Sequence, residues 1–174
     1  LSIRRQRQMC IRDRSVTGGD NTGLLALHSL SKTSNLASYR CGMISGDEAL
    51  VQELLEVRKH AGLIVPGPIQ HAMVAALESD LHEEMQRSAY ASRRLELLKA
   101  LPDAGFTVDH SDAGLYLWVR REGMDSRQAL DWFADRGILG APGDFYGPAG
   151  ASHVRIALTA PDEKITKAAR RITQ

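Results

Sequence analysis

The chain has 174 residues, of which 43% are hydrophobic and 25% are charged, and its formal net charge at pH 7 is +1. These values are typical of one globular domain, or of a small domain joined to part of a second. They give no electrostatic reason to expect a nucleic acid or an anionic membrane as partner, and no apolar run approaches the roughly 20 residues that span a bilayer.

The first 14 residues differ from the rest of the chain. They contain five arginines and show neither helical nor strand periodicity, and no apolar core follows them as a signal peptide would require. A basic arm that binds nucleic acid is one alternative. We interpret residues 1–14 as a basic leader that is not native to the protein. The arginines are Arg4, Arg5, Arg7, Arg12 and Arg14.

Regular patterns begin near Ser15. Short apolar runs at residues 24–28 and 43–45 predict strands, and the apolar spacing after Asp47 predicts a helix with Asp47 as its N-cap. A second helix is expected over residues 69–81. The spacing of residues 80–101 predicts a longer helix that can connect two domains.

The second half alternates strands and helices. Strands are expected at residues 106–108, 115–119 and 153–158, and helices at residues 126–136 and after Pro161. This alternation favours an α/β fold. We expect Tyr116 and Trp118, in the apolar run Leu-Tyr-Leu-Trp-Val, to fill the core of the domain that these elements form.

The chemistry is concentrated in residues 29–42, Ser-Leu-Ser-Lys-Thr-Ser-Asn-Leu-Ala-Ser-Tyr-Arg-Cys-Gly. An apolar strand leads to Lys32 in a loop of hydroxyl residues, and Arg40 follows eight residues later. An amine can form an imine with an aldehyde, and an arginine fork with hydroxyl donors suits a phosphate. A solvated lysine in a serine-rich loop is the alternative interpretation.

This segment resembles the cofactor-lysine motif of class I/II aminotransferases. The resemblance implies that Lys32 forms the Schiff base with pyridoxal 5'-phosphate and acts in catalysis, while Ser29 and Arg40 bind the cofactor phosphate. The segment His-Val-Arg-Ile-Ala-Leu at residues 153–158 resembles the family strand whose arginine binds the substrate carboxylate, and this role is carried to Arg155.

Several blocks also resemble actinobacterial-type N-succinyldiaminopimelate aminotransferases. They include Glu-Val-Arg-Lys-His-Ala-Gly at residues 56–62 and Ala-Pro-Gly-Asp-Phe-Tyr-Gly-Pro at residues 141–148. That likeness implies transamination of N-succinyl-diaminopimelate with 2-oxoglutarate and glutamate, on the route to lysine. The partners implied are small amino acids and 2-oxo acids, with a homodimer in the full-length enzyme.

The resemblance also implies the architecture. We expect the C-terminal part of the fold type I large domain at residues 15–85, and the small α/β C-terminal domain at residues 86–174. An upstream Asp, Asn, Tyr and phosphate loop of the family have no counterparts here, so we expect a C-terminal fragment that is inactive alone.

Two alternatives remain. The chain could be the pyridoxal-phosphate-binding effector domain of a transcription regulator, or part of another amino-acid aminotransferase. No metal site is expected, because histidines are scattered and the two cysteines, Cys10 and Cys41, lack neighbours at ligand spacing. That cysteine usage favours a reducing, cytoplasmic setting.

Overall fold

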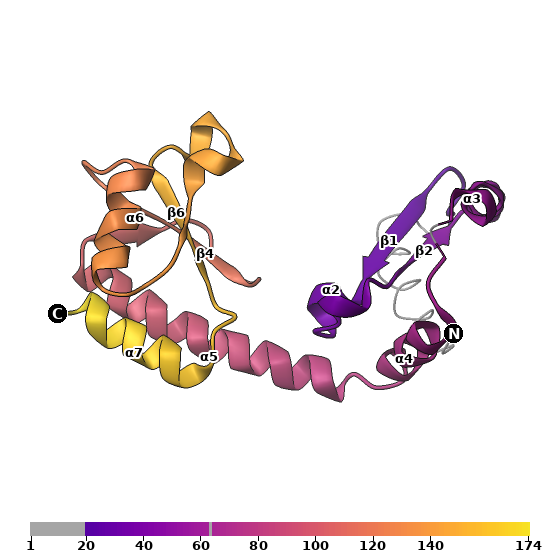
Figure 1. The fold of residues 1–174 in the computed structure, drawn as a ribbon, viewed down its shortest axis with the longest axis horizontal. Coiled ribbons are helices and arrows are strands. Elements are labelled where there is room, and N and C mark those ends of the chain that lie inside the picture. Colours follow the sequence, from indigo (N-terminus) through magenta and orange to yellow (C-terminus); the bar gives the residue numbers. More distant parts are fainter. Residues whose placement is uncertain (1–19, 63) are drawn as a thin grey trace. The chain divides into compact units, whose positions relative to one another are not determined.

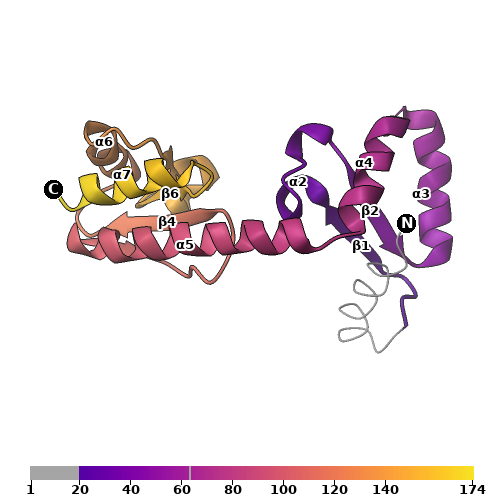
Figure 2. The same ribbon diagram turned by 90° about the horizontal axis from the view of Figure 1, so that it is seen from below.

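A computed structural model describes residues 20–62 and 64–174 of the protein (Figures 1 and 2), so the predicted leader at residues 1–14 lies outside the described residues. The chain divides into two compact units, the first ending at Glu84 and the second comprising Met85–Gln174. Among the described helices, none is both long enough and apolar enough to cross a membrane.

The first unit is built on an antiparallel pair of strands. β1 (Leu25–Ser29) pairs with β2 (Gly42–Gly46), with Ser29 opposite Gly42. At Gly42 a β-carbon would lie 2.7 Å from the backbone oxygen of His28, so the close approach of the two strands requires glycine there. The other elements of the unit are α2 (Leu30–Thr33), the 3-10 turn η1 (Ala37–Tyr39), α3 (Glu48–Ala61) and α4 (Gly67–Leu77).

The core of the first unit is small. Leu30, Cys41 and Leu77 are buried there, with partly buried apolar residues of β2 and α4 around them. Asp47 caps α3 as the sequence predicts, since its carboxylate accepts the backbone N–H groups of residues 49 and 50. However, α3 has no buried residue, and its Val57 is 65% exposed. The apolar spacing therefore predicted the helix correctly, but its apolar side chains are not buried within this unit.

The second unit places helices against one antiparallel sheet whose strand order is β3-β4-β6-β5. Figures 1 and 2 show α7 lying along α5. The elements are α5 (Leu81–Asp103, which begins just before the unit boundary), β3 (Phe106–Val108), β4 (Tyr116–Arg121), α6 (Ser126–Asp135), β5 (Ala141–Pro142), the 3-10 turns η2 (Gly143–Tyr146) and η3 (Pro148–Gly150), β6 (His153–Ala157) and α7 (Asp162–Ile172).

The two faces of this sheet differ sharply. Leu117 and Val119 of β4 and Val154 and Ile156 of β6 are buried in the core, together with residues of α5, α6 and α7. Because successive strand residues point to opposite faces, the alternate residues of β4 and β6 lie on the other face. The alternate residues are Tyr116, Trp118, Arg120, His153, Arg155 and Ala157.

The expected core positions of Tyr116 and Trp118 are therefore wrong. Tyr116 is 38% exposed, and neither ring belongs to the buried cluster that Leu117 and Val119 help to form. The run of five apolar and aromatic residues predicted the strand, but alternation along that strand assigns the two aromatic rings to the opposite face.

Helix α6 begins with a capping box, which yields a stability prediction. The Asp125 carboxylate accepts the backbone N–H groups of Arg127 and Gln128, both at 2.8 Å, and the Gln128 side chain accepts the N–H of Asp125 at 3.0 Å. We predict that Asp125→Ala lowers the free energy of unfolding of the second unit by about 1 kcal/mol. Both tryptophans, Trp118 and Trp132, lie in this unit, so urea unfolding followed by their fluorescence measures the change.

The matched control is Asp131→Ala, which removes an exposed aspartate from the same helix without touching its cap. An equal loss of stability in both variants would contradict the capping role of Asp125.

Candidate functional site

The loop that carries Lys32 is closed by strand pairing. Because Ser29 lies opposite Gly42, residues 30–41 leave the strand pair and return to it at the same end. Within this loop the backbone oxygen of Leu30 accepts the N–H groups of Ser34 and Leu36, each at 3.2 Å. The Leu30 side chain is fully buried. The loop is thus a compact turn. The pairing of the strands fixes its two ends, and the buried Leu30 side chain anchors it to the core of the unit.

Lys32 lies on the exposed side of this turn. It belongs to α2, two residues after Leu30, and two residues along a helix correspond to a rotation of about 200°. With Leu30 buried, the Lys32 side chain is therefore directed outward, and it is exposed. Its amine has no hydrogen-bond or ion-pair partner among the residues that the structure describes. It is therefore available to a ligand, and a one-turn helix at this position was not predicted.

Ser29 ends β1 and caps α2. Its hydroxyl oxygen accepts the N–H of Ser31 at 3.3 Å, which leaves its own proton free to donate. Its backbone oxygen accepts the hydroxyl of Thr33 at 3.1 Å. The adjoining Ser34 hydroxyl is buried and has no partner within the described structure. Of these hydroxyl groups, that of Ser29 is exposed and free to donate to a ligand.

Arg40 lies at the other end of the same loop. Its backbone is left-handed, with φ of 54° and ψ of 42°, and one guanidinium nitrogen donates to the backbone oxygen of Ala37 at 3.0 Å. The side chain is exposed and has no carboxylate partner among the described residues. Its remaining N–H groups can therefore bind an anion such as a phosphate.

These residues fit pyridoxal phosphate by their donor chemistry. The strand pair brings Ser29, Lys32 and Arg40 to one end of the first unit, where an unpaired amine, a hydroxyl donor and an arginine fork are all exposed. An aldehyde with a phosphate group needs these donors.

Arg155 lies in the second unit, on the face of the sheet opposite the core. Its guanidinium carbon is 4.2 Å from the ring centroid of Tyr116 and 5.3 Å from that of Tyr146. Its Nε is buried and makes no hydrogen bond in the described structure. The terminal N–H groups of the guanidinium have no partner in the described structure, and they can donate to a ligand carboxylate. The arrangement suits binding of a carboxylate.

Tyr116 is a functional candidate that the sequence analysis placed in the core, and Tyr146 is a second candidate. Strict alternation along residues 115–119 could have placed Tyr116 on the face opposite Leu117 and Val119. Its position is fixed from the preceding turn, where Arg94 of α5 is buried and donates to the Ser111 hydroxyl at 3.1 Å and to the backbone oxygen of Gly114. Tyr146 is placed by η2, and no local periodicity signals it.

A hydrogen-bonded group of ionisable residues lies farther along the same face. His153 Nε2 is 2.9 Å from Asp109 Oδ2, and Arg120 Nε donates to the same oxygen at 3.2 Å. The hydrogen bond with His153, reinforced by Arg120, holds the pKa of Asp109 below its ordinary value of 3.8. The carboxylate is therefore favoured in its charged form in the folded unit.

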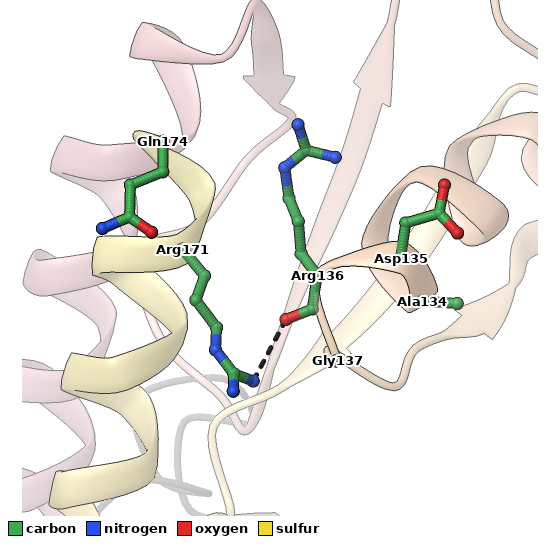
Figure 3. Close-up of a pocket in the computed structure, with 6 residues that line it drawn as sticks. All are labelled: Ala134, Asp135, Arg136, Gly137, Arg171 and Gln174. Carbon is green, nitrogen blue, oxygen red and sulfur yellow. Dashed lines mark hydrogen bonds between the residues drawn. The ribbon is translucent and has the colours of Figure 1, made fainter.

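An open depression elsewhere in the second unit has a structural explanation (Figure 3). It lies at the ends of α6 and α7, where the Arg171 guanidinium donates to the backbone oxygen of Arg136 at 3.1 Å. The Arg136 side chain extends away from the Arg171 guanidinium, and its guanidinium carbon lies 3.7 Å from the ring centroid of Trp132. Arginines commonly satisfy backbone oxygens at helix ends. The described residues also contain no group of His, Cys, Asp or Glu that could hold a metal ion.

Comparison with known proteins gives a consistent match. A family model described as aminotransferase class I and II matches residues 12–172. "Probable aminotransferase Rv1178" of Mycobacterium tuberculosis is 62% identical over 159 residues, which are 91% of this chain and 38% of that protein. "4-Dedimethylamino-4-oxo-anhydrotetracycline transaminase OxyQ" of Streptomyces rimosus is 57% identical over 168 residues, which are 97% of this chain and 46% of that protein.

A solved structure agrees with the sequence relatives. A probable N-succinyldiaminopimelate aminotransferase from Thermus thermophilus superimposes with a TM-score of 0.72 at 33% identity, covering 89% of this chain and 42% of that one. The chain therefore spans less than half the length of the proteins that it resembles.

The pKa of Asp109 predicts how acid affects the second unit. A carboxyl group whose pKa is lowered by folding stabilises the folded state above its unfolded pKa, and this contribution disappears as the pH falls through the folded pKa. We therefore predict that the urea midpoint of the chain falls between roughly pH 5 and pH 2, and that Asp109→Asn reduces this fall. Fluorescence-monitored unfolding at both pH values measures it.

The control for this experiment is Asp131→Asn, at an exposed aspartate of α6. It should retain the full acid dependence. If Asp109→Asn retains it as well, the ion pair does not contribute to acid stability.

Proposed function

This chain belongs to the aminotransferase class I and II family, whose enzymes depend on pyridoxal phosphate, and we propose that it supplies the cofactor lysine and the carboxylate-binding arginine of a transaminase. The observation that carries the proposal is the outward, unpaired Lys32 on the loop of residues 30–41, which starts directly after Ser29 and contains Arg40. The reaction would move an amino group from an amino acid to a 2-oxo acid.

Within this reaction Lys32 would bind the cofactor covalently and, once displaced by the substrate amine, carry a proton to and from the substrate α-carbon. A free lysine amine near its reacting atom can act as base and then as acid. Ser29 and Arg40 would hold the cofactor phosphate. Bound pyridoxal phosphate supplies the electron sink for the charge that develops on the α-carbon.

Arg155 would bind the α-carboxylate of the substrate. Its support is a guanidinium that lies beside two aromatic rings with its Nε buried and unpaired. Rings beside the guanidinium restrict its motion and exclude water from it, which strengthens a charge-assisted bond to a carboxylate. Such a bond orients the α-carbon, and orientation is a large part of enzymatic rate enhancement.

We propose N-succinyl-diaminopimelate as the amino donor and 2-oxoglutarate as the acceptor, and thus a role in lysine biosynthesis. The sequence blocks at residues 56–62 and 141–148 support this choice, and the Thermus thermophilus protein carries the same substrate in its name. The OxyQ relative, named for an oxo-anhydrotetracycline, favours a second candidate in which another ketone is aminated.

The remaining features of the proposal follow from the family. We propose a homodimer, and a cytoplasmic setting that is consistent with the free, buried thiol of Cys41. The matched proteins are named as aminotransferases, which supports the enzyme over a regulatory effector domain.

A chimera tests the activity. The region of the Mycobacterium tuberculosis relative that matches this chain would be replaced by this chain, and transamination would be measured by glutamate formation from 2-oxoglutarate. We predict an active chimera in which Lys32→Arg lowers kcat by at least about 10³-fold, because a guanidinium neither binds the aldehyde nor carries the proton. Lys59→Arg, on the exposed surface of α3, is the matched control and should retain full activity.

The same chimera tests the substrate. We predict a kcat/KM for N-succinyl-LL-diaminopimelate at least about tenfold above that for the unsuccinylated amino acid, a difference of about 1.4 kcal/mol in transition-state binding. Equal values would contradict the succinylated substrate, and amination of 4-dedimethylamino-4-oxo-anhydrotetracycline by the chimera would support the second candidate.

A further inference from the structure

The polar face of the second unit contains a continuous series of contacts that ends at Arg155. We propose that Trp118 is a positioning residue for Arg155, and that the hydrogen-bonded pair His153–Asp109 holds the Trp118 ring in place. The inference rests on the proposed function of Arg155 as the substrate-carboxylate ligand. It assigns to these side chains of the second unit a role in fixing the position of the carboxylate-binding arginine.

The backbone register places the residues side by side. Trp118 lies opposite Arg155, and Arg120 lies opposite His153, in the antiparallel pairing of β4 with β6. The N–H of Asp109 donates to the backbone oxygen of Trp118 at 3.0 Å, so Asp109 is fixed to the same strand. Side chains opposite one another on one sheet face are in direct reach.

The His153 ring supports one side of the indole. The two rings are stacked, with centroids 5.1 Å apart and an interplanar angle of 12°. Both ring nitrogens of His153 are engaged, Nε2 with Asp109 at 2.9 Å and Nδ1 with the Ser152 hydroxyl at 3.2 Å. Hydrogen bonds at both nitrogens fix the orientation of the imidazole, and its side chain is only 12% exposed. The ring is therefore a fixed support for Trp118.

The turn that carries Tyr146 packs against the Trp118 indole. Gly143 and Gly150 lie close to the indole. A β-carbon on Gly143 would be 3.0 Å from an indole atom, and one on Gly150 would be 3.2 Å from another. Tyr146, in the same turn, meets the indole edge-on at 5.6 Å with an interplanar angle of 79°. The position of Tyr146 therefore depends on the position of Trp118.

The rings of Tyr116 and Tyr146 position the Arg155 side chain. In the described structure the Arg155 side chain makes neither a hydrogen bond nor an ion pair, and its guanidinium lies beside the rings of Tyr116 and Tyr146. An arginine side chain has large rotational freedom, whose loss opposes ligand binding. A guanidinium already held by fixed rings loses less freedom when a carboxylate binds. Releasing Trp118 should therefore weaken carboxylate binding while leaving the core residues Leu117 and Val119 in place.

The first test observes Arg155 directly in the 174-residue chain. The ¹⁵N–¹H NMR signal of its Nε group is assigned by its loss in Arg155→Lys, and its hydrogen exchange is measured at constant pH. We predict that His153→Ala accelerates this exchange about tenfold, because the buried Nε becomes accessible when the rings loosen. His153→Gln, whose amide can still donate to Asp109, should restore most of the protection.

Two controls separate positioning from folding. Asp131→Asn, on the exposed side of α6, should leave the Arg155 exchange rate unchanged. The buried backbone N–H groups of Leu117 and Val119 should keep their protection in His153→Ala. If His153→Ala leaves the Arg155 signal and its exchange rate at the wild-type values in a folded chain, the inference is overturned. If His153→Ala also removes the exchange protection of the Leu117 and Val119 backbone N–H groups, His153 is needed for folding and the inference is again overturned.

A kinetic measurement in the chimeric enzyme gives a second readout. His153→Ala should lower kcat/KM for the amino-acid substrate about tenfold, with a raised KM, because the loosened Arg155 binds the carboxylate less tightly. A fall in kcat with no change in KM would contradict the proposal. If the unmodified chimera is inactive, the proposed function fails, but the NMR experiment still decides whether His153 and Trp118 position Arg155.

Discussion

The pairing of Ser29 with Gly42 is the constraint on which the candidate cofactor site depends. It closes the loop of residues 30–41, and the burial of Leu30 then fixes how that loop rotates. A residue two positions after a buried helical residue is directed outward, so Lys32 is exposed because Leu30 is not. The same closure brings Arg40 back to the strand end where Ser29 lies. The exposure of Lys32 is thus explained by the strand pairing and by the buried Leu30 side chain. Lys32 itself needs no strained backbone conformation.

The second unit applies another simple rule, the alternation of side chains along a strand. Successive residues of β4 and β6 point to opposite faces of the sheet. One face forms the core with Leu117 and Val154, and the other carries Trp118 and Arg155. The stability of the unit therefore depends on one set of residues, and the proposed substrate contact depends on the other. This separation allows the polar face to hold an unpaired guanidinium without disturbing the packing beneath it.

Sequence patterns located much of this arrangement and missed identifiable parts. The hydroxyl-rich loop and the spacing of Lys32 and Arg40 were visible because they are local in the chain. The faces of Tyr116 and Trp118 were misassigned because the run Leu-Tyr-Leu-Trp-Val is apolar or aromatic at every position, which conceals its period of two. The apolar spacing of α3 identified the helix but does not say what covers its apolar side chains, and Val57 is exposed.

The most direct test of the central claim is chemical trapping of pyridoxal phosphate on the chimeric enzyme. The chimera would be mixed with limiting cofactor, reduced with borohydride and mapped by peptide mass spectrometry. The chain offers five lysines, Lys32, Lys59, Lys99, Lys164 and Lys167. Selective labelling of Lys32, reduced when Arg40 is replaced by Gln, is expected if the loop binds the phosphate while the amine binds the aldehyde. Labelling spread over the lysines in proportion to their exposure, and unchanged by Arg40→Gln, would contradict the assignment of Lys32.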